Sequence, residues 1–258
     1  MSDGDMVNKG SQEARVNAAF VSMTDALMRE YDIVDLLSTL LNACIDVLDM
    51  DAGGILLADP TGQLELVAST SEEAEIVETI IIAAGEGPCI ESYDTASAVS
   101  VHDIELVAEK WPKFYASSKQ QGFRSTYAVP MRLRGDVMGV MNVLSSHIRE
   151  ITEEDGKVAQ ALADLAVLGV LHERNFRSPD LVTEQLHLAL DTRVLVEQAK
   201  GVLAQREKLT MTEAFDALRR YAREKGTTLR LVAEGTVRRT LATEDVVLKD
   251  SHAGAARS

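Results

Sequence analysis

The sequence predicts an α+β domain of ordinary size followed by a small all-α domain. Up to residue 175, segments with helical spacing alternate with short β-like runs, which is typical of an α+β domain. After Ser178-Pro179 the pattern changes to one long and two short helical segments. The balance of charge also changes between these two parts of the chain. Together these observations predict two domains within 258 residues.

The first predicted domain opens with helix and continues into a hairpin. Residues 14–50 carry apolar residues at helical spacing. Two β-like runs, Gly53–Asp59 and Leu64–Ser69, flank Pro60-Thr61-Gly62, which favours a turn. The elements expected next are a helix at Ser71–Ala83 with Ser71 as N-cap, a loop at Gly85–Pro88, a short strand at Ala98–His102 and a short helix at Lys110–Gln121.

Two longer strands and a helix complete this domain. Ser125–Leu133 and Val137–Ser145 flank Arg134-Gly135-Asp136, a sequence that permits a tight hairpin turn. The same three residues spell an adhesion motif, but a hairpin tip is the better interpretation because nothing else in the sequence suggests secretion. Thr152 opens a helix over Thr152–Asn175, with Asp155 three residues later as in a capping box.

The second predicted domain is a long helix followed by two short ones. Pro179 suits the first position of the long helix. Two adjacent aliphatic stripes recur every seven residues along it: Leu181, Leu188, Leu195 and Val202, and Val182, Ala189, Val196 and Leu203. Such stripes predict a coiled-coil-like helix that packs on a partner. A capping box at Thr210 and Glu213 opens the second helix, Gly226 ends it, and Thr228 caps the third.

Charge divides unevenly along the chain. Asp and Glu number 41 against 26 Lys and Arg, a net charge of −15, which excludes coating of nucleic acid or anionic membrane by bulk attraction. Residues 191–239 hold eleven basic and seven acidic residues, a net of +4, so the remaining residues carry −19. The second domain therefore has the electrostatic footprint of a nucleic-acid reader, although a solvated charged face is the commoner explanation from charge alone.

Few other features indicate a chemistry. Two cysteines, Cys44 and Cys89, form neither a disulfide framework nor a metal cluster, so a cytoplasmic location is expected. No apolar run approaches the length of about 18 residues that would suggest a membrane span. The isolated histidines His102 and His147 are more often structural than haem ligands. No Ser/His/Asp set, phosphate loop or His-rich metal spacing is recognisable, so we expect no enzymatic activity and no bound metal.

The motifs of the second domain resemble those of an ANTAR domain, the three-helix RNA-binding module of bacterial transcription antiterminators. The resemblance covers roughly residues 180–242 and rests on Val196–Leu203, Glu213–Phe215, Leu218–Ala222 and Leu231–Glu234. Residues 14–175 resemble a GAF sensor domain of the kind fused to ANTAR domains in actinobacteria. The segments that carry this second resemblance are Gly85–Cys89, Trp111-Pro112, Arg124-Ser125, Ala128–Gly135 and Gly139–Val143.

These resemblances imply a fold and its boundaries. We expect a GAF domain at residues 14–175, an antiparallel sheet with flanking helices, and an all-α ANTAR domain at 176–245 reached through the coiled-coil-like helix. Residues 1–13 and 246–258 are expected to be disordered ends. Two departures from the ANTAR pattern are Ala204, where methionine is frequent, and Gly235, which weakens the last helix and puts the roles of Arg238 and Arg239 in doubt.

The ANTAR resemblance also implies the partner, an RNA leader with tandem hairpins whose loops present unstacked bases. The residues implied to contact it are Arg193, Ala199, Lys200, Gly201, Arg219, Arg220, Arg223 and Arg230. Among them, Lys200 would donate to phosphate, and Ala199 and Gly201 would let RNA approach the helix closely. A homodimer whose geometry is set by the sensor would present two such surfaces to a paired target.

The GAF resemblance implies a pocket for a small-molecule effector, and the sequence does not identify the ligand or require a cofactor. Gly87, Pro88 and Cys89 are its candidate lining residues. Cys89 is open to three interpretations, a redox thiol, a bilin attachment point or a small apolar filler, of which the last is favoured because free cysteines are usually buried. The alternative function is a ligand-binding or dimerisation module without nucleic-acid activity.

Overall fold

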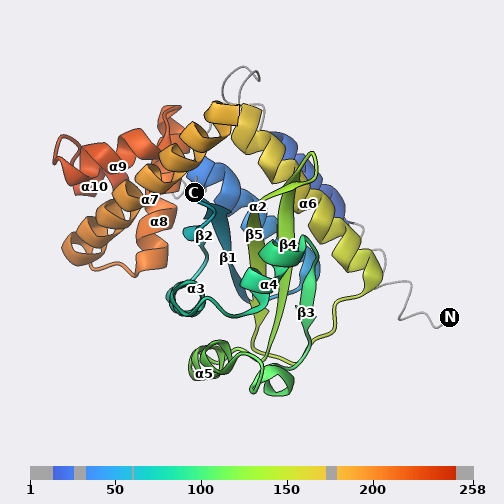
Figure 1. Cartoon of the computed structure of the whole chain (residues 1–258). Coiled ribbons are helices and arrows are strands. Elements are labelled where there is room, and N and C mark those ends of the chain that lie inside the picture. Colours follow the sequence, from blue (N-terminus) through green and yellow to red (C-terminus); the bar gives the residue numbers. More distant parts are fainter. Residues whose placement is uncertain (1–13, 26–32, 60, 173–178, 248–258) are drawn as a thin grey trace, which may run out of the picture. The chain divides into compact units, whose positions relative to one another are not determined.

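A computed structural model describes residues 14–25, 33–59, 61–172 and 179–247, with side chains described for 14–168 and 188–247 within those ranges. The chain divides into two compact units: residues 1–29 with 36–190, and residues 30–35 with 191–258 (Figure 1). The predicted boundary between residues 175 and 176 lies outside the described residues. The two units divide between residues 190 and 191, within helix α7 (Pro179–Glu207).

The first unit contains a five-stranded antiparallel sheet with the strand order β2-β1-β5-β4-β3. Its strands are β1 (Ala52–Ala58), β2 (Leu64–Ser69), β3 (Val99–Val101), β4 (Ser125–Leu133) and β5 (Asp136–Ser145). Each of them lies within a residue of the strand that the sequence predicts. The predicted hairpin is present, but its turn is one residue shorter than expected: Asp136 belongs to β5, and Arg134 and Gly135 form the turn at positive φ (53° and 103°).

Helices cover both faces of this sheet (Figure 1). They are α2 (Ile33–Leu48) and α6 (Glu153–His172) on one face, and α3 (Glu72–Ala84), α4 (Pro88–Thr95) and α5 (Pro112–Gln120) on the other. Two consecutive residues of β1 define the two sides. A Cβ atom on Gly53 would lie 3.0 Å from Leu41 of α2, and one on Gly54 would lie 2.9 Å from Glu78 of α3. Adjacent residues of a strand point to opposite faces, so α2 and α3 lie on opposite sides.

The strand register shows which residues of the other strands share these two faces. Gly54, Asn142 and Ala128 are paired neighbours on β1, β5 and β4, so they share the face under α3 and α4. The row beside it contains Tyr127 of β4, and a Cβ atom on Gly156 of α6 would lie 2.7 Å from the Tyr127 hydroxyl. The face under α3, α4 and α5 is closed by an apolar core that includes Trp111 and Phe114, packed edge to face with ring centroids 6.1 Å apart.

Local sequence explains where most of the helices begin and end, including the start of α4, which the sequence does not predict. Ser71 accepts a hydrogen bond from the Ala74 N–H at 3.2 Å and so caps α3 as predicted. Helix α4 was not predicted, and the expected loop at Gly85–Pro88 is one residue too long. Pro88 begins α4, because its fixed φ fits the first helical turn. The short 3-10 helix η1 (Ile104–Val107) was also not predicted.

The second unit is helical, as predicted. Its elements are the later part of α7, α8 (Met211–Lys225), α9 (Leu229–Val237) and α10 (Thr243–Val247). The capping box is present, with Thr210 N–H donating to Glu213 Oε2 at 2.8 Å and Glu213 N–H to Thr210 Oγ1 at 3.2 Å. Gly226 ends α8 at φ 59°, and Thr228 caps α9 as expected.

One predicted end is wrong. The disordered tail was expected from residue 246, but Val246 and Val247 belong to α10, and Val246 is buried. Apolar burial of Val246 explains why this short helix forms. Residues 1–13 and 248–258 lie outside the described residues. Among the helices that are described, none is both long and apolar enough to cross a membrane.

Candidate functional site

Lys200, predicted to donate to phosphate, lies on α7 and already interacts with two side chains of the second unit. Its Nζ is 2.8 and 2.9 Å from the two carboxylate oxygens of Glu197. The same atom lies 5.8 Å from the ring centroid of Phe215 on α8, and only 13% of the side chain is exposed. Lys200 therefore helps to hold α7 against α8, and contact with an anion would require it to exchange Glu197 for that anion.

Ala199 and Gly201 flank Lys200 but have opposite surroundings. Ala199 is completely buried, so its predicted place at an RNA surface is corrected, because a buried methyl group can contact only its own domain. Gly201 is exposed, and a Cβ atom built on it would meet nothing within 4 Å. No packing within the described residues thus explains a glycine in the middle of this helix, where it costs about 1 kcal/mol relative to alanine.

The predicted arginines divide between exposed and engaged positions. Arg219 Nε donates to Asp35 Oδ1 within the second unit, and the Arg219 guanidinium lies 5.6 Å from the Phe215 ring centroid. Arg223 is exposed and reaches the same Asp35 oxygen at 3.5 Å. Arg193 on α7 and Arg230 on α9 are half-buried. The structure thus brings Lys200 and Arg219 together around Phe215, with Arg223 one turn further along α8.

Arg220 has a structural role that the sequence did not indicate. Its guanidinium donates to the carbonyl oxygens of Val246 at 3.2 Å and Val247 at 3.4 Å. These carbonyls lie at the C-terminal end of α10, where a cation is favourable. Arg220 therefore ties α10 to α8. Arg238, whose role the sequence left in doubt, pairs with Glu234 at 2.9 Å.

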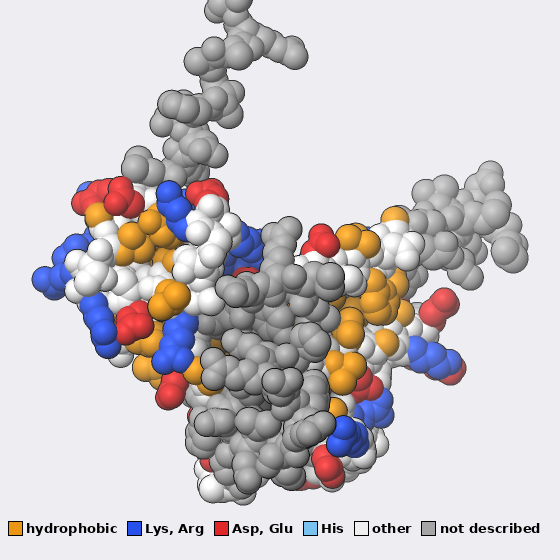
Figure 2. Space-filling model, turned by 90° about the horizontal axis from the view of Figure 1, so that it is seen from above, with side chains coloured by type: hydrophobic (Ala, Val, Ile, Leu, Met, Phe, Trp, Pro, Cys, Tyr) orange, Lys and Arg blue, Asp and Glu red, His pale blue; other side chains and the backbone are white. Residues whose placement is uncertain are grey.

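On the face of the second unit that Figure 2 displays, basic residues do not form one continuous patch. Figure 2 shows Lys and Arg side chains interspersed with acidic and hydrophobic ones on the face of these helices that it displays. Several exposed cations lie outside the predicted contact set: Arg206, Lys208, Lys225, Arg238 and Arg239. Binding of a polyanion would therefore depend on particular positions of charge more than on a uniform potential.

In the first unit, the candidate pocket residues Gly87, Pro88 and Cys89 are all buried at the start of α4. A Cβ atom on Gly87, which has φ 137°, would lie 3.1 Å from the side chain of Ile81. Pro88 and Cys89 pack into the apolar face of this unit, and Cys89 belongs to its central cluster. The structure thus places these three residues within packed side chains, and their part in a sensor pocket stays a prediction.

Cys89 also contacts a buried carboxylate that the sequence analysis did not single out. Its Sγ donates to Glu78 Oε2 at 3.3 Å, and Asn142 Nδ2 donates to Glu78 Oε1 at 2.6 Å. Glu78 is completely buried on α3. Desolvation raises the pKa of Glu78 to about 7, against the opposing effect of the two hydrogen bonds. Burial and the neighbouring carboxylate also raise the pKa of the Cys89 thiol, which makes it a poor nucleophile.

Comparison with protein families assigns both units. A GAF domain model matches residues 30–170, more than half of the chain, and an ANTAR domain model matches residues 184–237. The chain belongs to the GAF family and carries a C-terminal ANTAR domain. It therefore has the make-up of a GAF-ANTAR regulator, in which the GAF domain implies a small-molecule ligand and the ANTAR domain implies RNA binding. No curated protein matches the chain.

Solved structures are similar to the GAF domain at low sequence identity. The GAF domain of the phosphoenolpyruvate-protein phosphotransferase from Acinetobacter is 19% identical, with a TM-score of 0.48, 67% of this chain and 96% of that chain covered. The corresponding domain from Coxiella burnetii is 14% identical, with a TM-score of 0.48 and coverages of 62% and 94%. A type II free methionine-R-sulfoxide reductase from Thermoplasma acidophilum is 20% identical, with a TM-score of 0.40 and coverages of 54% and 94%.

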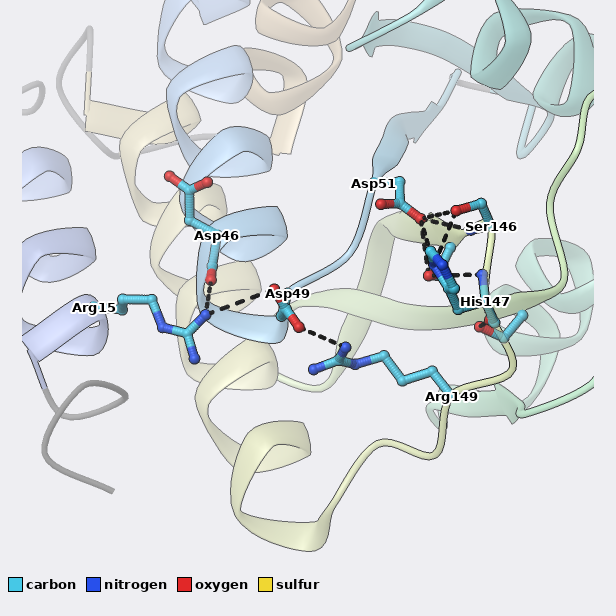
Figure 3. Close-up of polar contacts among 9 residues, drawn as sticks. Arg15, Asp46, Asp49, Asp51, Ser146, His147 and Arg149 are labelled. Atoms are coloured by element: carbon cyan, nitrogen blue, oxygen red, sulfur yellow. Dashed lines mark hydrogen bonds and ion pairs between the residues drawn. The ribbon is translucent and has the colours of Figure 1, made fainter. Parts of the chain in front are cut away.

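The GAF domain brings together a Ser, a His and an Asp that the sequence did not connect (Figure 3). Asp51 Oδ2 accepts from Ser146 N at 2.6 Å and Ser146 Oγ at 2.8 Å, and His147 Nδ1 lies 3.0 Å from Ser146 Oγ. Partial burial raises the pKa of Asp51, but the hydrogen bonds from Ser146 and Ser145 outweigh it and hold the pKa below its usual range. A catalytic triad needs the imidazole between hydroxyl and carboxylate, whereas here the serine donates directly to the aspartate. The set fixes the end of β5 to the start of β1.

A second charged group beside it joins segments that are distant in sequence. Asp49 lies 2.7 Å from Arg149 and 4.0 Å from Arg15, and Arg15 also donates to the Asp46 carbonyl at 3.1 Å (Figure 3). These contacts connect the helix at residues 14–25, the end of α2 and the loop before α6. Sequence alone shows these residues only as isolated surface charges.

The GAF domain also has a hollow away from α4. It measures about 520 Å³ and lies between the β4–β5 turn and α6, lined by Arg132, Leu133, Arg134, Gly135, Asp164 and Leu168. Arg132 and Asp164 are already paired there at 2.9 Å. Among the described residues, no group of three or more His, Cys, Asp or Glu side chains is placed to hold a metal ion.

Proposed function

We propose that this chain is an RNA-binding regulator that promotes transcription antitermination. Its ANTAR domain would bind paired hairpin loops in a leader RNA, and a signal sensed by the GAF domain would control that binding. The observation that carries the proposal is the ANTAR match over residues 184–237, on a helical unit whose local charge is opposite to that of the rest of the chain. The acidic remainder would repel unrelated RNA, so that binding depends on a small surface.

The exposed face of α7 supports this proposal. Gln198, Gly201 and Gln205 are exposed at helical spacing and line one side of the helix. Gly201 has no side chain, and no described residue lies within 4 Å of the place a Cβ atom would take, so a phosphate or base can approach the α7 backbone more closely than at any position with a Cβ atom. Arg223 supplies an exposed guanidinium for phosphate or for stacking on a loop base.

Binding of a tandem-hairpin RNA, measured over a range of salt concentrations, tests the proposal. We expect the logarithm of the affinity to fall linearly with the logarithm of salt concentration. Arg223→Ala should weaken binding and reduce the magnitude of that slope by about 1, as loss of one phosphate contact does. An RNA with the same stems and scrambled loops is the control for loop recognition, and it should bind much more weakly.

Gly201→Ala separates RNA contact from folding. The added methyl group meets nothing within the described part of the protein, so the fold should be retained or stabilised, while RNA affinity should fall if the backbone is approached closely. Gln205→Ala on the same face is the matched control and should have a smaller effect. Wild-type affinity in Gly201→Ala would contradict this contact surface. A folded protein without affinity for hairpin RNA would favour the alternative, a ligand-binding or dimerisation module.

Several further parts of the proposal concern assembly and location. We propose a homodimer whose geometry responds to a small-molecule effector of the GAF domain, because two ANTAR domains would engage a paired target with greater avidity. We further propose a binding role without catalysis, in the cytoplasm. Full RNA affinity in a protein that sedimentation shows to be monomeric would contradict the dimer.

A further inference from the structure

Glu78 occupies the interior of the GAF domain at the point where three elements meet. It comes from α3, while Asn142 comes from β5 and Cys89 from α4. Asn142 is itself oriented by Thr126 of β4, whose hydroxyl donates to Asn142 Oδ1 at 2.6 Å. The amide nitrogen of Asn142 therefore points to Glu78. All four side chains are completely or almost completely buried, so the network is shielded from water.

Among the described residues that pack around Glu78, none carries an opposite charge. The strands opposite α3 present Gly54 of β1, Leu66 of β2 and Asn142 of β5. From α5 the buried residues are Phe114, Ser117 and Ser118, none of which titrates. Cys89 of α4 is the titratable group that acts on Glu78 within the described residues, and its thiol is neutral. Solvation of an ionised Glu78 therefore rests on one amide donor and one thiol donor.

We propose that Glu78 is a proton-responsive switch in the GAF domain, in which uptake of one proton by its carboxylate reverses the hydrogen bond to Cys89. In the ionised state the Cys89 S–H donates to Glu78 Oε2, which the Sγ–Oε2 distance of 3.3 Å permits. A proton taken from solvent onto Oε2 gives a neutral carboxylic acid, whose O–H then donates to Cys89 Sγ. Asn142 Nδ2 donates to Oε1 in both states, so α3 stays attached to β5 while its link to α4 changes.

Two properties suit this group to respond to pH inside a cell. A buried carboxylate without a counter-ion takes up a proton more readily than one in water, and burial raises the pKa of Glu78 to about 7. Its two main contacts lie on different elements from its own, so the change in charge is felt at the packing of α3 on α4. The proposal concerns the GAF domain alone, and its test does not depend on RNA binding.

Infrared spectroscopy of the full chain over about pH 5 to about pH 9 tests the switch directly. The S–H stretching band of Cys89 should move to the position of a more weakly donating thiol as pH falls, together with the appearance of a protonated carboxylic acid band. Cys44, which is buried on α2, provides an internal comparison, because its band should not move. Cys89→Ala and Cys44→Ala assign the two bands.

Two variants complete the experiment. Glu78→Gln removes the titrating group at nearly constant volume and should abolish both spectral changes. Glu73→Gln, on the exposed side of the same helix, removes one carboxylate and should leave the changes as in the wild type. Loss of both changes in Glu78→Gln alone supports the proposal. A Cys89 band that does not respond to pH in the wild type, or a response retained in Glu78→Gln, overturns it.

Discussion

Polar side chains serve the two domains of this chain in different ways. In the GAF domain, Glu78, Asn142 and Thr126 form a continuous hydrogen-bonded network in the buried interior. In the second unit, Lys200 and Arg219 are also mostly buried, but each is paired with a partly exposed carboxylate. Lys200 pairs with Glu197, and Arg219 pairs with Asp35. The buried network of the GAF domain fixes the position of neutral and acidic groups. The ion pairs of the second unit keep cations close to the surface.

This difference shows where mutations affect folding and where they affect binding. Removing a partner inside the GAF domain leaves another group buried and unsatisfied, which is costly. Removing a cation from the ANTAR unit leaves an acidic residue that water can reach. We therefore expect stability effects to be larger in the GAF domain, and functional effects to separate from stability more easily in the ANTAR unit.

The largest expected effect follows from Asn142→Ala. This change leaves Glu78 without its amide donor and Thr126 without its amide acceptor, both in the interior. We expect the free energy of unfolding to fall by about 3 kcal/mol or more at neutral pH. Denaturant unfolding measures it. Asn42→Ala, at an exposed position of α2, is the control and should cost less than about 1 kcal/mol. Equal losses in the two variants would contradict the cost assigned to breaking the buried network.

The second effect is a pH dependence that belongs to Glu78. Its pKa is raised from 4.5 to about 7 in the folded protein, so between these values the folded state holds a proton that the unfolded state has released. Stability from this group is therefore present below pH about 4.5 and is lost as pH rises through about 7. As pH rises over this range, the free energy of unfolding of the wild type should fall by roughly 3 kcal/mol relative to that of Glu78→Gln. A difference that does not change with pH would contradict the burial of the charge.

A smaller effect is expected at the corner of α8 and α10. Arg220→Ala removes two hydrogen bonds to the Val246 and Val247 carbonyls and should cost about 1–2 kcal/mol. Arg223→Ala, one turn away and exposed, should change stability by less than about 0.5 kcal/mol. Arg220→Ala should therefore lower stability more than Arg223→Ala, whereas Arg223→Ala should remove more direct contact with RNA. Amide hydrogen exchange of residues 243–247 measures the loosening of α10.

The smallest effect has the opposite sign. Gly201→Ala should raise the free energy of unfolding by up to about 1 kcal/mol, because alanine loses less conformational entropy in a helix and the new methyl group has open space around it. Thermal unfolding of the variant and the wild type measures the gain. A stability loss would mean that Gly201 is packed against a part of the chain outside the described residues.

Local chemistry explains which elements could be predicted from the sequence. The β4–β5 hairpin, the Ser71 cap and the Thr210–Glu213 capping box depend on residues close together in the chain, and all three were predicted. Glycine and proline favour a loop at Gly85–Pro88 and so conceal α4, although proline also suits the first position of a helix. Helix α10 was missed because only its contact with α8 reveals it.

The candidate sites depend even more on contacts between residues that are distant in sequence, which the sequence alone does not predict. Basic residues in the ANTAR segment could be found by counting, but their pairing with Glu197 and Asp35 depends on the folded structure. Glu78 could not be found at all, because it is one of several glutamates in α3 and only the packing of α3 on the sheet makes it buried. Ala199 was misplaced because a small residue suits both a close contact with a ligand and a tightly packed helix interface.

The two glycines of β1 make the sheet thin at the point where the buried carboxylate touches it. Glu78 from one helical layer and Leu41 from the other each lie close enough to meet a Cβ atom on Gly54 or Gly53, at 2.9 and 3.0 Å. At these two positions β1 places no side chain between the layers. Here only the strand backbone separates the two helical layers, so a side chain added at Gly53 or Gly54 would have to displace Leu41 or Glu78.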